Sequence, residues 1–319
     1  MLLLIVLLLC IFFIVFSSTK LKLHSFLALL FAALGFGLFT GMPLNLIVES
    51  INTGFGNTLG YIGIVIVAGT IIGVFLEYSG GAYTLADKIL KIIGEKRVPH
   101  AMAIIGWFVS IPVFADSGFV ILSPLNKALS KRANISLAGP AIALSLGLIA
   151  THCLVPPTPG PIAAAGIIGA NLGLVILFGV IASFIALFFG WLFSVKVAAR
   201  VHIDPNPEIT QEEIDIKMKE APSAFKALTP IFLPIILIVM KSISDFPTNP
   251  FGTGAAKTLL GFLGEPVIAL LIGVLIAFML PKKRKKGIYS DTGWVGKALK
   301  ISATIILITG AGGAFGKVL

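Results

Sequence analysis

Charged residues are scarce in this sequence. Asp, Glu, Lys and Arg together make up 12% of the 319 residues, about half the share found in ordinary soluble domains. Hydrophobic residues make up 57% and the mean hydropathy is +1.04, which leaves too little polar surface to coat a water-soluble globule. Apolar stretches of roughly 15 to 25 residues recur along most of the chain, and about 20 are needed to cross a bilayer. The composition therefore predicts a polytopic, all-α membrane protein rather than a soluble enzyme.

Cysteine and the familiar catalytic motifs are scarce as well. The two cysteines, Cys10 and Cys153, lie in separate apolar segments and are interpreted as small core residues rather than a disulfide framework. The four histidines are scattered, and the sequence contains no nucleophile elbow and no phosphate-binding G-x-x-x-x-G-K-[ST] loop. We therefore predict no metal or other cofactor, no intramembrane enzyme and no ATP-driven pump.

The net charge of +10 could suggest a nucleic-acid partner, but the placement of the basic residues indicates a membrane. The predicted spans are 2–17, 23–39, 57–78, a broken span at 137–170, 172–195, 228–245, 265–280 and 296–318, with an apolar hairpin at 98–130. With the N-terminus outside, 21 of the 24 Lys and Arg residues fall on the inner side. This positive-inside pattern fixes the orientation and predicts the lipid bilayer, not nucleic acid, as the partner. The basic run 282–286 is interpreted as an anchor beside the inner leaflet.

The hairpin 98–130 is predicted to enter and leave the membrane on the same side. Both of its flanks are basic, and its two apolar legs of about 13 residues are joined by Pro112-Val113-Phe114-Ala115-Asp116. A helix of 13 residues rises about 20 Å, which is too short for a hydrocarbon core of about 30 Å. We therefore predict a re-entrant hairpin that opens to the cytoplasm. The alternative, two short tilted spans with an external turn, would reverse every later segment.

The apolar stretch 137–170 is predicted to be a broken helix. Four prolines fall between Pro156 and Pro161, and proline removes a backbone donor and clashes with the preceding turn. Irregular backbone is tolerated at membrane depth only where protein or a water-filled cavity surrounds it. The first position of the second helical piece is predicted at Pro161.

A short motif appears twice and predicts two related halves. Gly69-x-x-x-Gly73-x-x-Leu76 recurs as Gly312-x-x-x-Gly316-x-x-Leu319, on spans that cross in opposite directions by the charge count. Matched glycines on oppositely directed spans are typical of an inverted repeat, although this glycine spacing also marks ordinary close helix packing.

The repeat predicts the domain organisation. Residues 1–200 form the first repeat, with an interfacial helix at 80–93 and a return span at 172–195. Residues 201–227 form a polar cytoplasmic linker, and 228–319 form a partial second repeat. About 120 residues of the first repeat follow the position that corresponds to Leu319, so the second repeat is expected to be truncated.

The hairpin tip and the broken helix are expected to form the binding site. Each begins a helix near mid-membrane, and helix N-termini favour anions in a low dielectric, so the site suits a small carboxylate. The predicted substrate-binding residues are Ser117, Gly118, Thr151, Thr158 and Gly160, whose hydroxyls and amides can meet a hydroxy acid.

Asp116 and His152 are the predicted proton-coupling residues, because they are the ionisable groups placed deep in the membrane. Such residues usually face a cavity and act in transport, and histidine titrates near physiological pH. The alternative is structural, with Asp116 as the N-cap of the second hairpin leg and His152 as a hydrogen-bonded neighbour. Glu77, Asp245 and Glu265, at the ends of spans, are interpreted as interfacial.

Several segments resemble the gluconate permease family of bacterial proton symporters: FLEYSGGA (75–82), IPVFADSGFVILSPL (111–125), LIATHCLVPPTPGPIAAA (148–165) and GAGGAFGKVL (310–319). The resemblance runs from Gly41-Met42-Pro43-Leu44 to Leu319. It implies symport of gluconate or a related small hydroxy or sugar acid with protons across the bacterial cytoplasmic (inner) membrane. Related members carry glycerate or D-serine.

The resemblance also implies an inverted-repeat fold of the ion-transporter superfamily, and a homodimer whose hairpin domain moves against a scaffold. The sequence departs from the gluconate members at two positions: Asp116 stands where they carry Glu, and Thr158 where they carry His. A cation/proton antiporter of the same architecture, with Asp116 binding the cation, is the alternative function.

Overall fold

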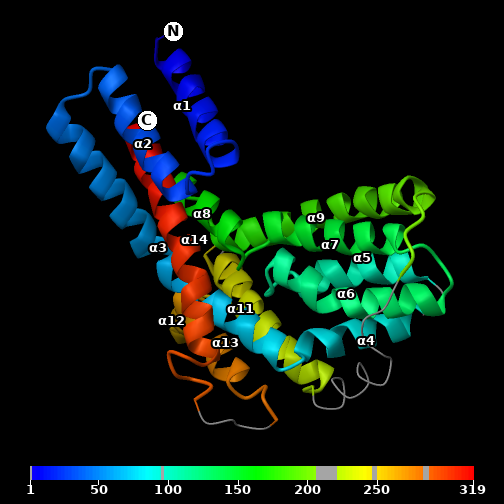
Figure 1. Cartoon of the computed structure of the whole chain (residues 1–319). Helices are drawn as coiled ribbons and strands as arrows, with labels where there is room; N and C mark the ends of the chain where they lie inside the picture. Colours follow the sequence, from blue (N-terminus) through cyan, green and yellow to red (C-terminus); the bar gives the residue numbers. More distant parts are fainter. Residues whose placement is uncertain (1, 95–96, 206–220, 246–249, 283–286) are drawn as a thin grey trace. The chain divides into compact units, whose positions relative to one another are not determined.

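The structure, a computed structural model, describes residues 2–94, 97–205, 221–245, 250–282 and 287–319, and all regular elements in these ranges are helices (Figure 1). Five helices are long and apolar enough to cross a membrane: α1 (Leu2–Thr19), α3 (Leu44–Tyr78), α9 (Leu172–Lys196), α11 (Ala224–Ser244) and α14 (Trp294–Val318). A sixth candidate is the pair α12 (Ala255–Leu263) and α13 (Pro266–Ala277), which is bent by 66°. The all-α class with several candidate spans is therefore confirmed.

The remaining helices are shorter or less apolar. They are α2 (Ser25–Phe39), α4 (Gly81–Ile93), α5 (Val98–Val109), α6 (Ala115–Arg132), α7 (Ala138–Leu154), α8 (Pro159–Ile168) and a 3-10 turn, η1 (Ala198–Arg200). The predicted hairpin corresponds to α5 and α6, and the predicted broken helix to α7 and α8. Helix α4 is amphipathic, with Leu85 and Leu90 buried and an Asp87–Lys91 ion pair of 2.7 Å on its exposed side.

The structure differs from the sequence-based prediction in several places. Helix α3 begins at Leu44 instead of residue 57, and α12 was not expected. The second hairpin leg, α6, has 18 residues rather than about 13, which gives a rise of about 27 Å. The length argument for a re-entrant hairpin therefore holds for α5 alone.

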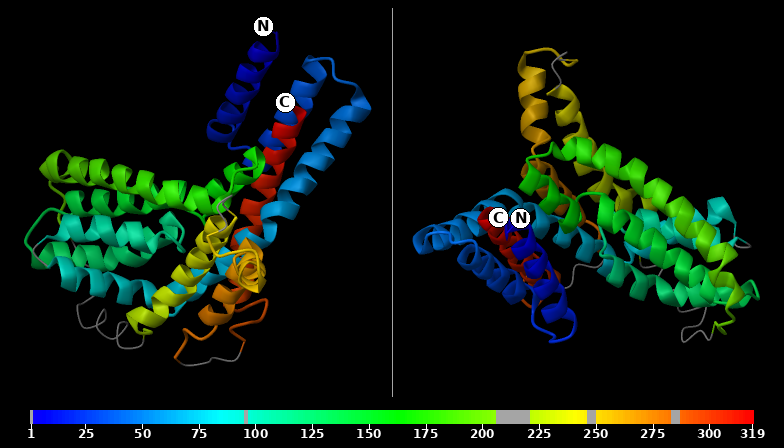
Figure 2. Two further views of the ribbon diagram at one scale, coloured as in Figure 1. Left: turned by 180° about the vertical axis from the view of Figure 1, so that it is seen from behind. Right: turned by 90° about the horizontal axis from the view of Figure 1, so that it is seen from above.

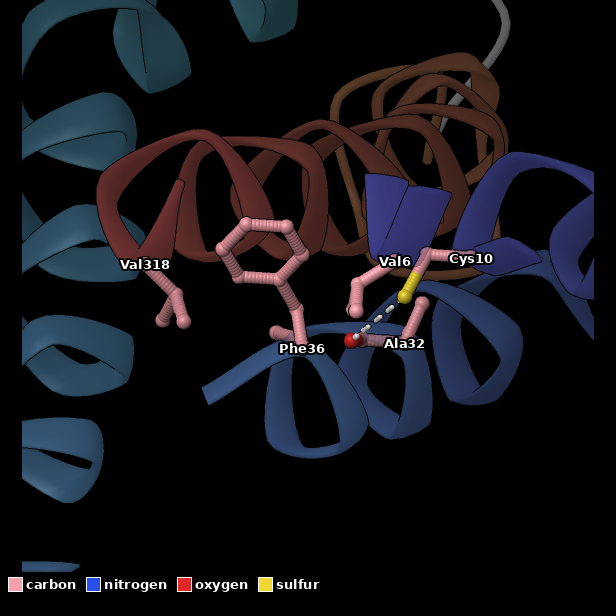
Figure 3. Close-up of a cluster of buried hydrophobic side chains, with 6 residues drawn as sticks. Val6, Cys10, Ala32, Phe36 and Val318 are labelled. Carbon is pink, nitrogen blue, oxygen red and sulfur yellow. Dashed lines mark hydrogen bonds between the residues drawn. The ribbon is translucent and has the colours of Figure 1, made fainter. Parts of the chain in front are cut away.

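The chain forms two compact units. Unit 1 comprises Met1–Ile66, Ala163–Ala170 and Lys300–Leu319. In it, α1 packs on α2 around a cluster of buried side chains (Figure 3): Val6, Cys10, Ala32, Ala33, Phe36 and Val318. The Cys10 thiol donates to the Ala32 carbonyl at 3.6 Å, so this cysteine acts as a small core residue with a weak hydrogen bond. Cys153 is exposed near the end of α7, so its interpretation as a core residue is wrong.

Unit 2 comprises Val67–Ile162 and Asn171–Leu299. Its helices α4, α5, α6, α7 and α9 lie side by side (Figures 1 and 2). Helices α5 and α7 approach closely because Gly106 and Gly147 each face a carbonyl group of the other helix, where a Cβ atom would not fit. Most of the predicted linker 201–227, namely residues 206–220, lies outside the described residues, as does 283–286 of the basic run.

Candidate functional site

Two glycines of α3 contact the two irregular backbone segments of unit 2, the hairpin turn between α5 and α6 and the break between α7 and α8. The Pro112 carbonyl in the hairpin turn occupies the space that a Cβ atom on Gly73 would need. One helical turn earlier, a Cβ atom on Gly69 would lie 3.3 Å from the carbonyl oxygen of Pro157, in the break between α7 and α8. Four residues of helix advance about 6 Å along the axis. The hairpin turn and the helix break are therefore neighbours on one stripe of α3.

Asp116 lies at the start of α6, just after the hairpin turn. The N-cap of α6 is Phe114, and no side chain caps this helix end by a hydrogen bond. Asp116 occupies the second helical position and its side chain is exposed. The alternative that Asp116 is the N-cap residue is therefore wrong, although a negative charge in the first turn still interacts favourably with the helix dipole.

His152 lies in the last turn of α7, opposite the hairpin turn. Its ring contacts that of Phe114 edge to face, with the centroids 5.7 Å apart. It also lies within electrostatic reach of Asp116. The His152 Nδ1 atom is buried without a hydrogen-bond partner in the part of the chain that the structure describes. Because an unpaired buried polar atom costs about 1–3 kcal/mol, this nitrogen is suited to a ligand or a water molecule.

Two predicted substrate-binding hydroxyls are already engaged. Thr151 is 0% exposed, and its hydroxyl donates to the Trp107 carbonyl at 2.8 Å, which joins α7 to α5. The Thr158 hydroxyl donates to the Val155 carbonyl at 2.7 Å and closes the turn between α7 and α8. Both side chains are buried and stabilise the backbone around the break.

The other predicted substrate-binding residues lie at helix N-termini. Ser117 is partly buried in the first turn of α6, while the Gly118 amide already donates to the Phe114 carbonyl at 2.8 Å. Helix α8 begins at Pro159, two residues before the predicted start at Pro161. Since neither proline has an N–H group, Gly160 supplies the one backbone donor among the first three residues of α8. A Cβ atom on Gly160 would meet nothing within 4 Å, so this donor is approachable.

Glu77, interpreted from the sequence as an interfacial residue at the end of a span, also lies near this group. It lies one turn after Gly73 on α3 and within electrostatic reach of both Asp116 and Lys297. The signal that could have found it is the spacing of four residues from Gly73, which places Glu77 on the side of α3 that meets the hairpin turn.

A metal centre is not supported by the described residues: across residues 2–94, 97–205, 221–245, 250–282 and 287–319, no group of three or more His, Cys, Asp or Glu side chains could hold an ion. The chemistry that this arrangement offers is instead ionisable side chains beside exposed helix N-termini. Such a site can bind a small anion and exchange protons.

Comparison with known proteins identifies the family of the chain. Residues 1–319 match the family model described as GntP family permease. The chain is 40% identical to an uncharacterized permease of Haemophilus influenzae, over 98% of this chain and 66% of that protein. It is 34% identical to a gluconate permease of Pseudomonas aeruginosa (94% and 67% covered) and 35% identical to the D-serine transporter DsdX of Escherichia coli (98% and 70% covered). It spans about two thirds of the length of these curated relatives. The chain belongs to the GntP family of permeases.

Proposed function

We propose that this protein moves gluconate or a related small hydroxy or sugar acid, together with protons, across the bacterial cytoplasmic membrane. Relatives named as gluconate permease and as L-idonate transporter, 34% and 32% identical, support a sugar-acid substrate. A relative named as an inner membrane permease, 32% identical, supports the location.

The proposed architecture is the inverted repeat described from the sequence, with 1–200 as the first repeat, 201–227 as the linker and 228–319 as part of the second. In this arrangement α5 and α6 form a hairpin that opens to the cytoplasm. The basic flanks of the hairpin support this orientation. As in other transporters with broken helices, the substrate would bind near the bilayer midplane. A homodimer whose hairpin domain moves against a scaffold belongs to the same proposal.

The observation that carries the proposal is the close packing of the Pro112 carbonyl against Gly73 and of the Pro157 carbonyl against Gly69. These contacts hold the hairpin turn before α6 and the break before α8 on neighbouring turns of α3, which supports a site built from the first-turn amides of both helices. In the proposed site the first-turn amides of α6, around Ser117, and the Gly160 amide bind the substrate carboxylate. Gly118, Thr151 and Thr158 shape the backbone around it.

Proton coupling is assigned to Asp116 and His152. Asp116 is exposed in the first turn of α6. His152 has a buried ring nitrogen, Nδ1, without a hydrogen-bond partner among the described residues. The two lie within electrostatic reach of each other, which supports a shared role.

The test is uptake of a radiolabelled panel of sugar acids into proteoliposomes under an imposed proton gradient. We expect accumulation of at least one hydroxy acid that collapses when an uncoupler removes the gradient. Carboxylate-independent proton exchange with a cation would instead support the antiporter of the same architecture.

D-serine is the second candidate substrate, because two relatives named as D-serine transporters are 35% identical to this chain. An amino acid would place its carboxylate at the helix N-termini and its ammonium group beside Asp116. Including D-serine in the panel, with L-serine as the control, distinguishes the two substrate classes.

A further inference from the structure

A pocket of about 340 Å³ lies within unit 1, between three helices that are far apart in the sequence. Its lining comes from α3, from the second half of α8 and from the end of α14. Small-molecule sites in proteins have volumes of about 300–1,000 Å³. The pocket is therefore large enough for a ligand of the size of a sugar acid.

Glycines let these helices pack closely around the pocket. A Cβ atom on Gly54 of α3 would clash with the Gly313 carbonyl of α14, and one on Gly313 would clash with the Thr58 hydroxyl. A Cβ atom on Gly166 of α8 would lie 2.7 Å from the Tyr61 ring. These contacts fix α3 against α14 and α8, so Thr58 and Tyr61 are held at the wall of the pocket.

The polar groups of the pocket suit an anion that carries hydroxyl groups. Lys317 is the one charged residue among the described residues that line it, which makes the pocket electropositive. The Asn57 amide and the hydroxyl groups of Thr58 and Tyr61 complete the polar lining. In the part of the chain that the structure describes, these four side chains have no hydrogen-bond or ion-pair partner. They are therefore available to a carboxylate and to the hydroxyl groups that accompany it.

The position of these groups in the proposed topology favours a binding role. Asn57 lies at the outer end of the predicted span 57–78, and Lys317 lies at the outer end of the predicted span 296–318. Lys241, another basic residue predicted on the outer side, is paired with Glu265, whereas Lys317 lines the pocket. This topology puts the pocket at the outer face of the membrane, where an imported substrate arrives.

We infer that this pocket binds a small hydroxy acid from the outer solution, with Lys317 pairing with the carboxylate and Asn57, Thr58 and Tyr61 binding hydroxyl groups. The inference rests on the proposed function, which supplies the substrate class and the direction of transport. It adds a second substrate site, built from residues of unit 1. Attraction to the Lys317 ammonium group raises the rate at which the anion is captured.

A structural role is the competing explanation. Lys317 lies in the last turn of α14, where a positive charge interacts favourably with the helix dipole. The other three polar side chains would then only pack against neighbouring protein. In that case Lys317→Gln lowers the melting temperature, and no carboxylate changes the accessibility of the pocket.

Chemical protection at the pocket distinguishes these explanations. Gly316 lines the pocket and a Cβ atom there meets nothing within 4 Å, so Gly316→Cys in a Cys153→Ser background places a reactive thiol in it. We expect gluconate to slow the reaction of this thiol with a small reagent in a saturable manner, and sorbitol, an uncharged polyol, to leave it unchanged. Lys317→Gln should raise the gluconate concentration needed at least tenfold, and Lys317→Arg should restore it. Lys300→Gln, near the other end of α14, is the matched control and should have no effect.

A second ligand tests for direct contact. Tyr61→Phe removes one hydroxyl group, and we expect it to weaken protection by gluconate about two- to tenfold. Protection by propionate, which carries no hydroxyl group, should not change. Absence of protection by gluconate, protection that survives in Lys317→Gln, or equal weakening for both ligands in Tyr61→Phe would overturn the proposal.

Uptake into proteoliposomes separates this inference from the proposed function. If the wild type accumulates no carboxylate or D-serine, the proposed function fails, whether or not gluconate protects the pocket. If the wild type accumulates gluconate and gluconate does not protect Gly316→Cys, the inference alone fails. When both hold, we expect Lys317→Gln to raise the gluconate concentration for half-maximal uptake at least tenfold.

Discussion

The hydroxyl of Thr151 on α7 donates a hydrogen bond to the main-chain carbonyl of Trp107 on α5, at 2.8 Å and out of contact with solvent. Thr151→Val keeps the shape of the side chain and leaves that carbonyl without this donor. We expect a loss of about 1–3 kcal/mol in the free energy of unfolding. Substrate affinity should change little, and Thr151→Ser should restore stability. Thermal unfolding and equilibrium binding measure the two effects. A large loss of substrate affinity at unchanged stability would indicate that Thr151 binds the substrate directly.

The glycines of the repeated motif differ in their surroundings, which gives a matched pair of variants. Gly73→Ala places a methyl group into the Pro112 carbonyl, whereas a Cβ atom on Gly316 meets nothing within 4 Å. We expect Gly73→Ala to cost about 1–3 kcal/mol by overpacking. Gly316→Ala should be neutral, or stabilise α14 by up to about 1 kcal/mol. Melting temperatures in detergent provide the measurement, and equal effects of the two variants would contradict the close approach.

Asp116→Asn removes the titratable group at the start of α6 and keeps its size. Accumulation driven by a proton gradient should fall by at least tenfold, while exchange of labelled for unlabelled substrate continues. Uptake and counterflow assays on the same proteoliposomes compare the two. Full accumulation with an unaltered pH profile would show that Asp116 serves α6 only through its favourable interaction with the helix dipole.

The direction of the hairpin can be tested by labelling single cysteines. Cys153 is exposed and Cys10 is buried, so Cys153→Ser provides a background of low reactivity. Arg97→Cys, before α5, and Lys131→Cys, near the end of α6, should react with a membrane-impermeant thiol reagent from the cytoplasmic side alone. Lys257→Cys on α12 should react from the opposite side. Reaction of either hairpin position from outside would exclude a re-entrant path.

Much of the helix layout could be predicted because it is encoded locally. The consecutive prolines Pro156 and Pro157 disfavour a continuous helix, and the structure places the break at 155–158, between α7 and α8. Helix α3 starts at Leu44, before the predicted residue 57, although Glu49 and Asn52 interrupt the apolar sequence of 44–56. A helix in contact with other helices tolerates such residues, since its backbone is satisfied internally.

The candidate site was predictable only in part. Asp116 and His152 stand out as isolated ionisable residues in apolar sequence, and the structure brings them within electrostatic reach. The position of Glu77 near the hairpin turn could not be predicted, because it depends on the long-range contact between Gly73 and Pro112. The engagement of the Thr151 and Thr158 hydroxyls was equally invisible, since it depends on which carbonyl groups the folded backbone presents.

The seating of Pro112 and Pro157 on adjacent turns of α3 has a mechanical consequence. An α-helix is stiff over a single turn, because successive backbone hydrogen bonds fix its rise. The hairpin turn and the helix break therefore cannot change their spacing without leaving their glycines. Any movement that exposes this region alternately to the two sides of a membrane has to move the hairpin turn and the helix break together as a rigid body, with the hinge elsewhere.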